Sequence, residues 1–156
     1  KAEQRVDAYG EVDELNAYLG AAVSTGIDPD LAEMLVEIQR CLFSLGASLA
    51  DPSTRASGHA KVTATETDVE RLEGWIDSLE TELAPLRQFI LPGGHPTAAS
   101  LHLARAVCRR AERRVVGLGA SKVDATVIMY VNRLSDLLFV LARVVNVRAG
   151  VAEQEW

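Results

Sequence analysis

The sequence predicts an all-α fold, and three observations support this prediction. Apolar residues recur with helical period in five segments of the 156-residue chain, and the alternation typical of strands is absent. Gly, Pro and short polar runs separate the five segments. Hydrophobic residues make up 48% of the chain and charged residues 24%, a balance typical of a compact soluble domain with a full core. We therefore expect residues 1–156 to form a single helical domain.

The first two helices are predicted from apolar periodicity and a clear start signal. The first covers about residues 6–24. The second covers about residues 29–50, because Asp28 is a capping residue and Pro29 suits the first helical position. Residues 51–61 are polar and rich in turn formers, so they predict a surface loop.

The remaining three helices follow in the second half of the chain. Thr63–Glu66 matches a capping box, which predicts a third helix that extends to about residue 83. Residues 85–96 contain three prolines and a Gly pair, and they predict a loop. The fourth helix is predicted at about 97–118 and the fifth at about 124–148. Five long helices joined by turns predict an antiparallel bundle with the up-down topology of ferritin-like folds.

Composition and charge exclude several classes of function. The net charge is −6, which argues against general nucleic-acid binding, because that requires a basic surface. The apolar run 137–147 contains Arg143 and Asn146, so we expect no membrane-spanning segment. Cys41 and Cys108 are too few for a disulfide framework, and we therefore expect a cytoplasmic protein.

Positive charge is concentrated in the fourth predicted helix. Its clustered arginines are Arg105, Arg109, Arg110, Arg113 and Arg114. Arg105, Arg109 and Glu112 are spaced i, i+4 and i+7, so they share one face, and Arg113 extends the positive charge. Guanidinium forks suit phosphate oxygens. The spacing is equally compatible with a phosphate site and with a solvated face or ion-pair network.

Two other helices carry polar residues in apolar surroundings. Asp13 and Asn16 share a face of the first predicted helix, and Asn132 and Asp136 lie one turn apart in the fifth. A helical asparagine either caps a buried carbonyl, which we favour, or binds an adenine or ribose edge. Asp13 and Asp136 are both candidate partners for Arg105, because a buried arginine without an acid is costly.

The Pro-bounded loop contains an unusually apolar Phe-Ile-Leu at residues 89–91. We expect Phe89 to be either a buried core residue, which we favour, or a cover for a flat cofactor beside a polar site. The sequence lacks the Glu-x-x-His pairs of di-iron bundles and the motifs GxxxxGK[ST], GxSxG and HExxH. It therefore predicts no metal site built from side chains and none of these hydrolytic mechanisms.

Taken in order, these segments resemble the PduO-type ATP:cob(I)alamin adenosyltransferases. The ordered set is specific, although each piece alone is weak, and with the helix spacing it covers nearly the whole chain. The matching stretches are KAEQRVDAYGEVDELNAYLG (1–20), IQRCLFSLGASLA (38–50), FILPGG (89–94), RAVCRRAERRVV (105–116) and NRLSDLLFVLAR (132–143).

The resemblance implies an assembly and a reaction. The family forms homotrimers of five-helix bundles that bind ATP and cobalamin between neighbouring subunits. Its reaction transfers the 5′-deoxyadenosyl group of ATP to cob(I)alamin and releases triphosphate, with Mg²⁺ bound mainly through ATP. A flavoprotein reductase and an adenosylcobalamin-dependent client enzyme are then expected partners. Two alternatives stay open: a non-catalytic carrier or sensor of ATP or adenosylcobalamin, and a purely structural bundle.

The resemblance also implies which residues form the site. Those matched to catalysis are Arg109, Phe89, Asp13 and Arg105. Those matched to ATP binding are Lys1, Arg109, Arg110, Glu112, Arg113 and Asn132. Those matched to the cobalamin pocket are Phe89 and Phe139.

By the same resemblance, these residues have distinct roles. Lys1 and Arg109 grip the triphosphate, and Arg105 pairs with Asp13 across a subunit interface. Phe89 closes the lower face of the corrin and leaves a four-coordinate cobalt that is easier to reduce. The family's Thr- and Gly-rich arm, which precedes the matched lysine, has no counterpart here, so we expect the chain to begin inside a longer gene product.

Overall fold

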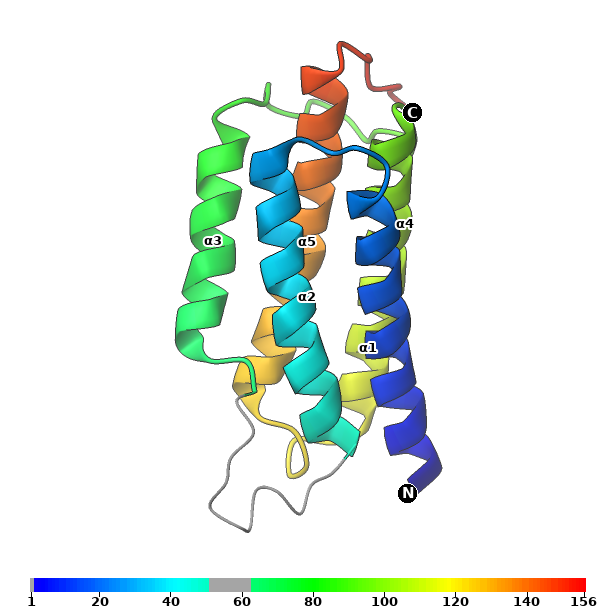
Figure 1. Cartoon of the computed structure of the whole chain (residues 1–156), viewed down its shortest axis with the longest axis vertical. Coiled ribbons are helices and arrows are strands. Elements are labelled where there is room, and N and C mark those ends of the chain that lie inside the picture. The colour runs from blue at the N-terminus through cyan, green and yellow to red at the C-terminus, as the bar shows by residue number, and fades with distance from the viewer. Residues whose placement is uncertain (1, 51–62) are drawn as a thin grey trace.

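The computed structural model describes residues 2–50 and 63–156 and shows a bundle of five helices (Figure 1). The helices are α1 (Ala2–Val23), α2 (Pro29–Ala50), α3 (Glu66–Glu80), α4 (Pro96–Gly117) and α5 (Ala125–Arg148). Successive helices run in opposite directions (Figure 1), so the predicted all-α, antiparallel up-down bundle is confirmed. Lys1 and the predicted loop 51–61 lie outside the described residues.

The packing order of the helices decides which faces are available for a site. α4 packs against α1 and α5, α1 also packs against α2, and α3 packs against α5. The α1–α2 turn, the α3–α4 loop and the C-terminal segment (residues 149–156) lie at one end of the bundle, whereas the α4–α5 turn lies at the other (Figure 1). A site on the α4–α5 surface is therefore bordered at one end by the apolar loop that contains Phe89.

α5 is the central helix of the bundle, because apolar residues are buried along nearly its whole length. By length and composition it is apolar enough to cross a membrane, contrary to the expectation from residues 137–147. However, 56% of its apolar window is buried inside the bundle. Burial of this kind is expected for the core helix of a bundle, which is hydrophobic all round.

A reciprocal pair of hydrogen bonds fixes the spacing of α1 and α2. The Asn16 amide donates to the Gln39 carbonyl at 3.3 Å, and the Gln39 amide donates to the Asn16 carbonyl at 3.1 Å. A Cβ at Gly20 would lie 3.1 Å from the Gln39 amide nitrogen, so the small residue permits the close approach. The favoured structural role of Asn16, binding a carbonyl, is therefore confirmed.

The predicted start of the third helix is displaced by two residues. Thr65, not Thr63, is the N-cap, and its partner in the capping box is Asp68 rather than Glu66. The Asp68 amide donates to the Thr65 hydroxyl at 3.2 Å, and the Thr65 amide donates to the Asp68 carboxylate at 2.8 Å. Thr63–Glu66 and Thr65–Asp68 both have the spacing of a capping box. Ala64, which directly precedes Thr65, is buried, and this favours a helix that starts after Thr65.

Candidate functional site

The arginines of α4 divide into two rows, and the first row is paired with α1. Arg110 donates to Glu11 at 2.5 Å and also pairs with Glu14. Arg114 lies 4.0 Å from Asp7. These carboxylates raise the pKa of Arg110 further, mainly because Arg110 donates a hydrogen bond to Glu11. The ion-pair network, one of the two alternatives for the clustered arginines, therefore exists. It includes Arg110 and Arg114 of α4.

The second row consists of Arg105, Arg109 and Arg113, spaced one turn apart along α4. Within residues 2–50 and 63–156, none of these three arginines forms an ion pair. Arg109 and Arg113 are exposed, whereas Arg105 is half-buried. Three guanidinium groups that form no ion pair in the described part of the chain concentrate positive charge locally on an acidic protein.

Two contacts between α4 and α5 frame this row. The Arg105 guanidinium lies over the Phe139 ring, 5.2 Å from the ring centroid. At the other end, the Asn132 amide donates to the Glu112 carboxylate at 2.9 Å. Arg105 and Glu112 are seven positions apart on α4, and Asn132 and Phe139 are seven positions apart on α5. Seven positions correspond to about 10 Å at 1.5 Å per residue. Arg109 lies between Arg105 and Glu112 on α4, and therefore between these two contacts.

His102 supports the Phe139 end of this surface. The His102 ring meets the Phe139 ring edge to face, with centroids 6.0 Å apart. It is buried, and its Nε2 has no hydrogen-bond partner among the described residues. Burial lowers the pKa of His102, and the charge of Arg105 lowers it further. The imidazole is therefore neutral at pH 7 and packs as an aromatic group.

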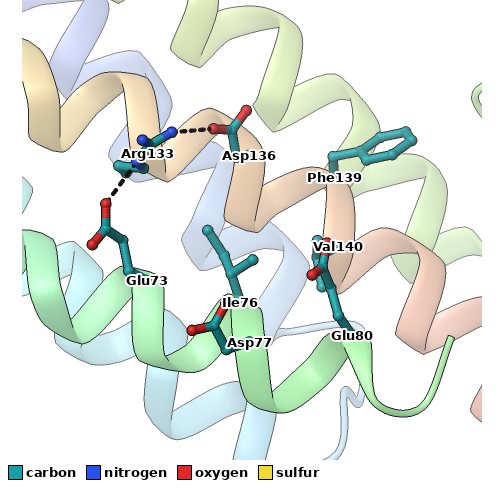
Figure 2. Close-up of a pocket in the computed structure, with 8 residues that line it drawn as sticks. All are labelled: Glu73, Ile76, Asp77, Glu80, Arg133, Asp136, Phe139 and Val140. Atoms are coloured by element: carbon teal, nitrogen blue, oxygen red, sulfur yellow. Dashed lines mark hydrogen bonds and ion pairs between the residues drawn. The ribbon is translucent and has the colours of Figure 1, made fainter.

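A groove between α3 and α5 borders Phe139 on the side away from α4. Its volume is about 470 Å³. The residues that line it are Glu73, Ile76, Asp77, Glu80, Arg133, Asp136, Phe139 and Val140. Figure 2 shows these side chains, with Arg133 between its two carboxylate partners. Arg133 donates to Glu73 at 2.9 Å and to Asp136 at 3.2 Å, so the suggestion that Asp136 pairs with Arg105 is wrong within this chain.

Asp13 lies on a different surface, in a groove of about 300 Å³ between α1 and α2. The walls of this groove are mainly apolar, and they include Tyr9 and Phe43. Phe43 is 74% exposed, which is unusual for a large aromatic side chain. Asp13 and Arg105 form no ion pair with each other in the described part of the chain. An ion pair between these two residues therefore requires a second copy of the chain.

The Phe89 loop, residues 84–95, is paired with the C-terminal segment. The Leu91 amide donates to the Gln154 carbonyl at 2.8 Å, and the Trp156 amide donates to the Phe89 carbonyl at 2.9 Å. An isolated antiparallel bridge joins Ile90 to Glu155. The Phe89 side chain itself is 81% exposed. The expectation that Phe89 is a buried core residue is therefore wrong. Its ring lies in solvent, while its backbone is hydrogen-bonded to the C-terminal segment.

Arg143 anchors both partners of this pairing to α5. It is buried, with 8% of its surface exposed. Its Nε donates to Glu153 at 2.9 Å, at the start of the paired C-terminal segment. Its guanidinium also donates to the Ala84 carbonyl at 3.0 Å, at the start of the Phe89 loop. A charged residue that interrupts the most apolar helix is a sequence signal for such a role, although the position alone does not identify its partners.

Comparison with known proteins points to one family. A family model described as cobalamin adenosyltransferase matches residues 1–145. The corrinoid adenosyltransferase of Bacillus subtilis is 43% identical over 162 residues, which cover 100% of this chain and 81% of that protein. The corrinoid adenosyltransferase of Mycobacterium tuberculosis is 42% identical over 150 residues, which cover 94% of this chain and 78% of that protein.

Solved structures agree with the sequence comparison. A variant of the PduO-type ATP:corrinoid adenosyltransferase from Lactobacillus reuteri, complexed with cobalamin and ATP, is similar with a TM-score of 0.88. Its sequence identity is 37%, and the match covers 98% of this chain and 86% of that chain. A second variant of that enzyme, complexed with ATP, gives the same TM-score and identity.

Proposed function

The chain belongs to the cobalamin adenosyltransferase family, and we propose that it transfers the 5′-deoxyadenosyl group of ATP to cob(I)alamin. In this reaction the cobalt(I) electron pair attacks the ribose C5′ carbon and forms a cobalt–carbon bond. The C5′–O bond breaks, and triphosphate leaves with its electron pair. Cobalt is oxidised from the one-plus to the three-plus state. The nucleophile is therefore the substrate itself, and the protein supplies alignment and charge stabilisation.

The observation that carries this proposal is the row of arginines on α4 that form no ion pair with any acid in the described residues. Negative charge develops on the departing triphosphate, and the exposed Arg109 lies on α4 between two contacts that join α4 to α5. We assign Arg109 to the phosphates, with Arg113 extending the same charge. Lys1 adds to this grip, and the Asn132–Glu112 hydrogen bond orients the nucleotide end of the surface. Removing one such donor costs about 3 to 4 kcal/mol of transition-state stabilisation.

The aromatic residues belong to the corrinoid side of the proposed site. The Phe89 side chain is exposed, and its backbone carbonyl is hydrogen-bonded to the C-terminal segment. An exposed ring on a fixed backbone is suited to cover the lower face of the corrin. Excluding the lower axial ligand leaves a four-coordinate cobalt(II) that accepts an electron more readily. Phe139, held against Arg105 and His102, forms part of the apolar wall of this pocket.

A homotrimer completes the proposed site. Arg105 has no acidic partner among the described residues, and Asp13 lies in an apolar groove beside the exposed Phe43. Packing of the α1–α2 groove of one subunit against α4 of the next would bury Phe43 and allow Asp13 to pair with Arg105. This ion pair would set the register of the interface.

The remaining components follow from the chemistry. No group of three or more His, Cys, Asp or Glu in the described ranges could hold a metal ion, so we propose that Mg²⁺ binds mainly through the ATP phosphates. The ion would help to neutralise the triphosphate. A cytoplasmic flavoprotein reductase would supply electrons, and an adenosylcobalamin-dependent enzyme would receive the product.

Binding of ATP to the folded chain tests the proposal against a purely structural bundle. ATP at 100 times its dissociation constant should raise the free energy of unfolding by about 2.7 kcal/mol if it binds only the folded state. Urea denaturation with and without Mg-ATP measures this shift. A purely structural bundle predicts no shift, and that result would overturn the proposed ATP site.

A further inference from the structure

Asn146 is a buried residue of α5 whose amide oxygen and nitrogen each form a hydrogen bond with the Phe89 loop. Only 2% of its surface is exposed. The His95 amide donates to Asn146 Oδ1 at 2.8 Å, and Asn146 Nδ2 donates to the Gly93 carbonyl at 3.0 Å. The Asn146 carbonyl also accepts from the Val151 amide at 2.9 Å. One residue therefore fixes the end of the loop and the beginning of the C-terminal segment.

Gly94 makes this contact possible. Its φ is +99°, a conformation that other residues adopt only with strain. A Cβ at this position would lie 2.2 Å from Asn146 Oδ1, which is closer than any side chain allows. A larger residue at position 94 would displace the Asn146 amide, even though Asn146 itself would be unchanged.

Asn146 and the C-terminal segment together hold the loop at every second residue. Phe89 and Leu91 are bonded to the C-terminal segment, and Gly93 and His95 are bonded to Asn146. The backbone is thus fixed from Phe89 to His95, yet the Phe89 ring remains 81% exposed. Fixing an exposed group before its ligand arrives reduces the ordering cost of binding, which is the effect of preorganisation.

We propose that Asn146 is a positioning residue for Phe89. The proposal rests on the proposed function, in which the Phe89 ring covers the lower face of the corrin. Asn146 touches neither substrate nor cobalt in this account. Its amide holds the Gly93–His95 turn, and the fixed turn prevents the loop from carrying the ring away from the corrin. Loss of the amide should therefore affect reduction of cobalt(II), where the axial ligand must be excluded, more than alkylation of cobalt(I).

The test uses two disruptive variants and one matched control. Asn146→Ala removes the amide, and Gly94→Ala displaces it. Gly119→Ala is the control, because Gly119 has φ +92° and no atom within 4 Å of its added Cβ. Gly119 follows α4, at the end of the bundle away from the Phe89 loop (Figure 1). The control therefore carries similar backbone strain without a clash against Asn146.

The first readout is amide hydrogen exchange in the protein without substrates. The Leu91 and Trp156 amides are bonded between the loop and the C-terminal segment and not to Asn146. Faster exchange at these two amides in both disruptive variants, but not in Gly119→Ala, is expected if Asn146 fixes the backbone at Phe89. Unchanged exchange in Gly94→Ala and Asn146→Ala would overturn the proposal, whatever the activity.

The second readout compares two adenosylation rates with Mg-ATP. One starts from cob(II)alamin with a chemical reductant, and the other starts from prereduced cob(I)alamin. In both disruptive variants we expect the first rate to fall by about 100-fold and the second to stay close to that of Gly119→Ala. Equal losses in the two rates would reduce Asn146 to a purely structural role. If the wild-type chain forms no product from either substrate, the proposed function fails, and the exchange measurement still decides whether Asn146 fixes the loop.

Discussion

The Arg105 guanidinium lies over the Phe139 ring, with its central carbon 5.2 Å from the ring centroid. This contact holds a cation on the α4–α5 surface without an acid to neutralise it in the described part of the chain. A cation–π contact of this kind contributes about 0.5 to 1 kcal/mol at an exposed site. The arrangement leaves the Arg105 guanidinium available for the ion pair with Asp13 that we propose between subunits.

Replacement of Arg105 by Met should weaken the assembly while keeping an apolar stem against Phe139. Asp13→Asn should weaken it by a similar amount, because each change removes one partner of the proposed intersubunit pair. The double variant should be little worse than either single variant, since the same interaction is lost in all three. Sedimentation velocity measures the trimer fraction. Losses that simply add in the double variant would show that Asp13 and Arg105 are not partners.

Replacement of Arg109 by Ala should slow adenosyl transfer by two to three orders of magnitude, or about 3 to 4 kcal/mol. The side chain is exposed, so the free energy of unfolding without ATP should change little. Arg114→Ala is the matched control, because Arg114 lies on the row that faces Asp7 of α1. Steady-state kinetics at saturating ATP measures the loss. Similar rates in the two variants would contradict the assignment of Arg109 to the phosphates.

Replacement of Phe89 by Ala should leave the stability of the fold intact, because 81% of the residue is exposed. It should slow adenosylation that starts from cob(II)alamin far more than adenosylation of prereduced cob(I)alamin. The physical reason is that an open lower face lets an axial ligand reach cobalt and hinders its reduction. Parallel anaerobic assays from the two oxidation states measure the difference. A uniform loss would mean that Phe89 contributes only to binding.

Arg148 holds three carboxylates at the end of the bundle that carries the Phe89 loop. It donates to Asp28 at 3.0 Å, to Asp30 at 2.9 Å and to Glu82 at 2.7 Å. Hydrogen bonds from Arg148 lower the pKa values of Asp30 and Glu82. The unfolded chain therefore binds more protons than the folded chain as the pH approaches 4. The stability from these pairs is present above that range and is lost as the pH falls through the lowered pKa values.

Arg148→Gln should therefore reduce the free energy of unfolding at pH 7 by about 1 kcal/mol, since the pairs are partly exposed. The difference from wild type should disappear below the lowered pKa values. Arg40→Gln is the control, because Arg40 is exposed on α2 and forms no ion pair in the described residues. Urea denaturation from pH 7 to pH 3 measures both variants. A difference that stays constant as the pH falls from 7 to 3 would show that Arg148 acts through packing.

Most of the fold follows from periodicity, because α1 to α4 each bury one apolar stripe, whereas α5 is buried along nearly its whole length. In α5, Leu134, Leu137, Leu138 and Leu141 recur at helical spacing, and all four are fully buried. Boundaries were less predictable: α1 begins at Ala2 rather than near residue 6, and α3 ends at Glu80 rather than near residue 83. Both ends depend on local capping and packing that a period does not specify.

The site was only partly predictable from the residues. Spacing placed Arg105, Arg109 and Glu112 on one face of a helix, but it could not separate arginines that pair with α1 from those that do not. That division depends on which neighbour packs against α4. Asn146 was seen as a polar interruption of an apolar helix, yet its partners lie more than fifty residues earlier. Partners at such distances come from topology, which local sequence patterns do not encode.

The most direct test is an anaerobic absorbance assay with cob(I)alamin and Mg-ATP. It uses this chain, both alone and preceded by the Thr- and Gly-rich arm typical of the family. The account predicts that adenosylcobalamin and triphosphate form in equal amounts, and only when both substrates are present. Tight binding of corrinoid without turnover by either form would contradict an enzyme and favour a carrier. Absence of both binding and turnover would limit the family relationship to the fold.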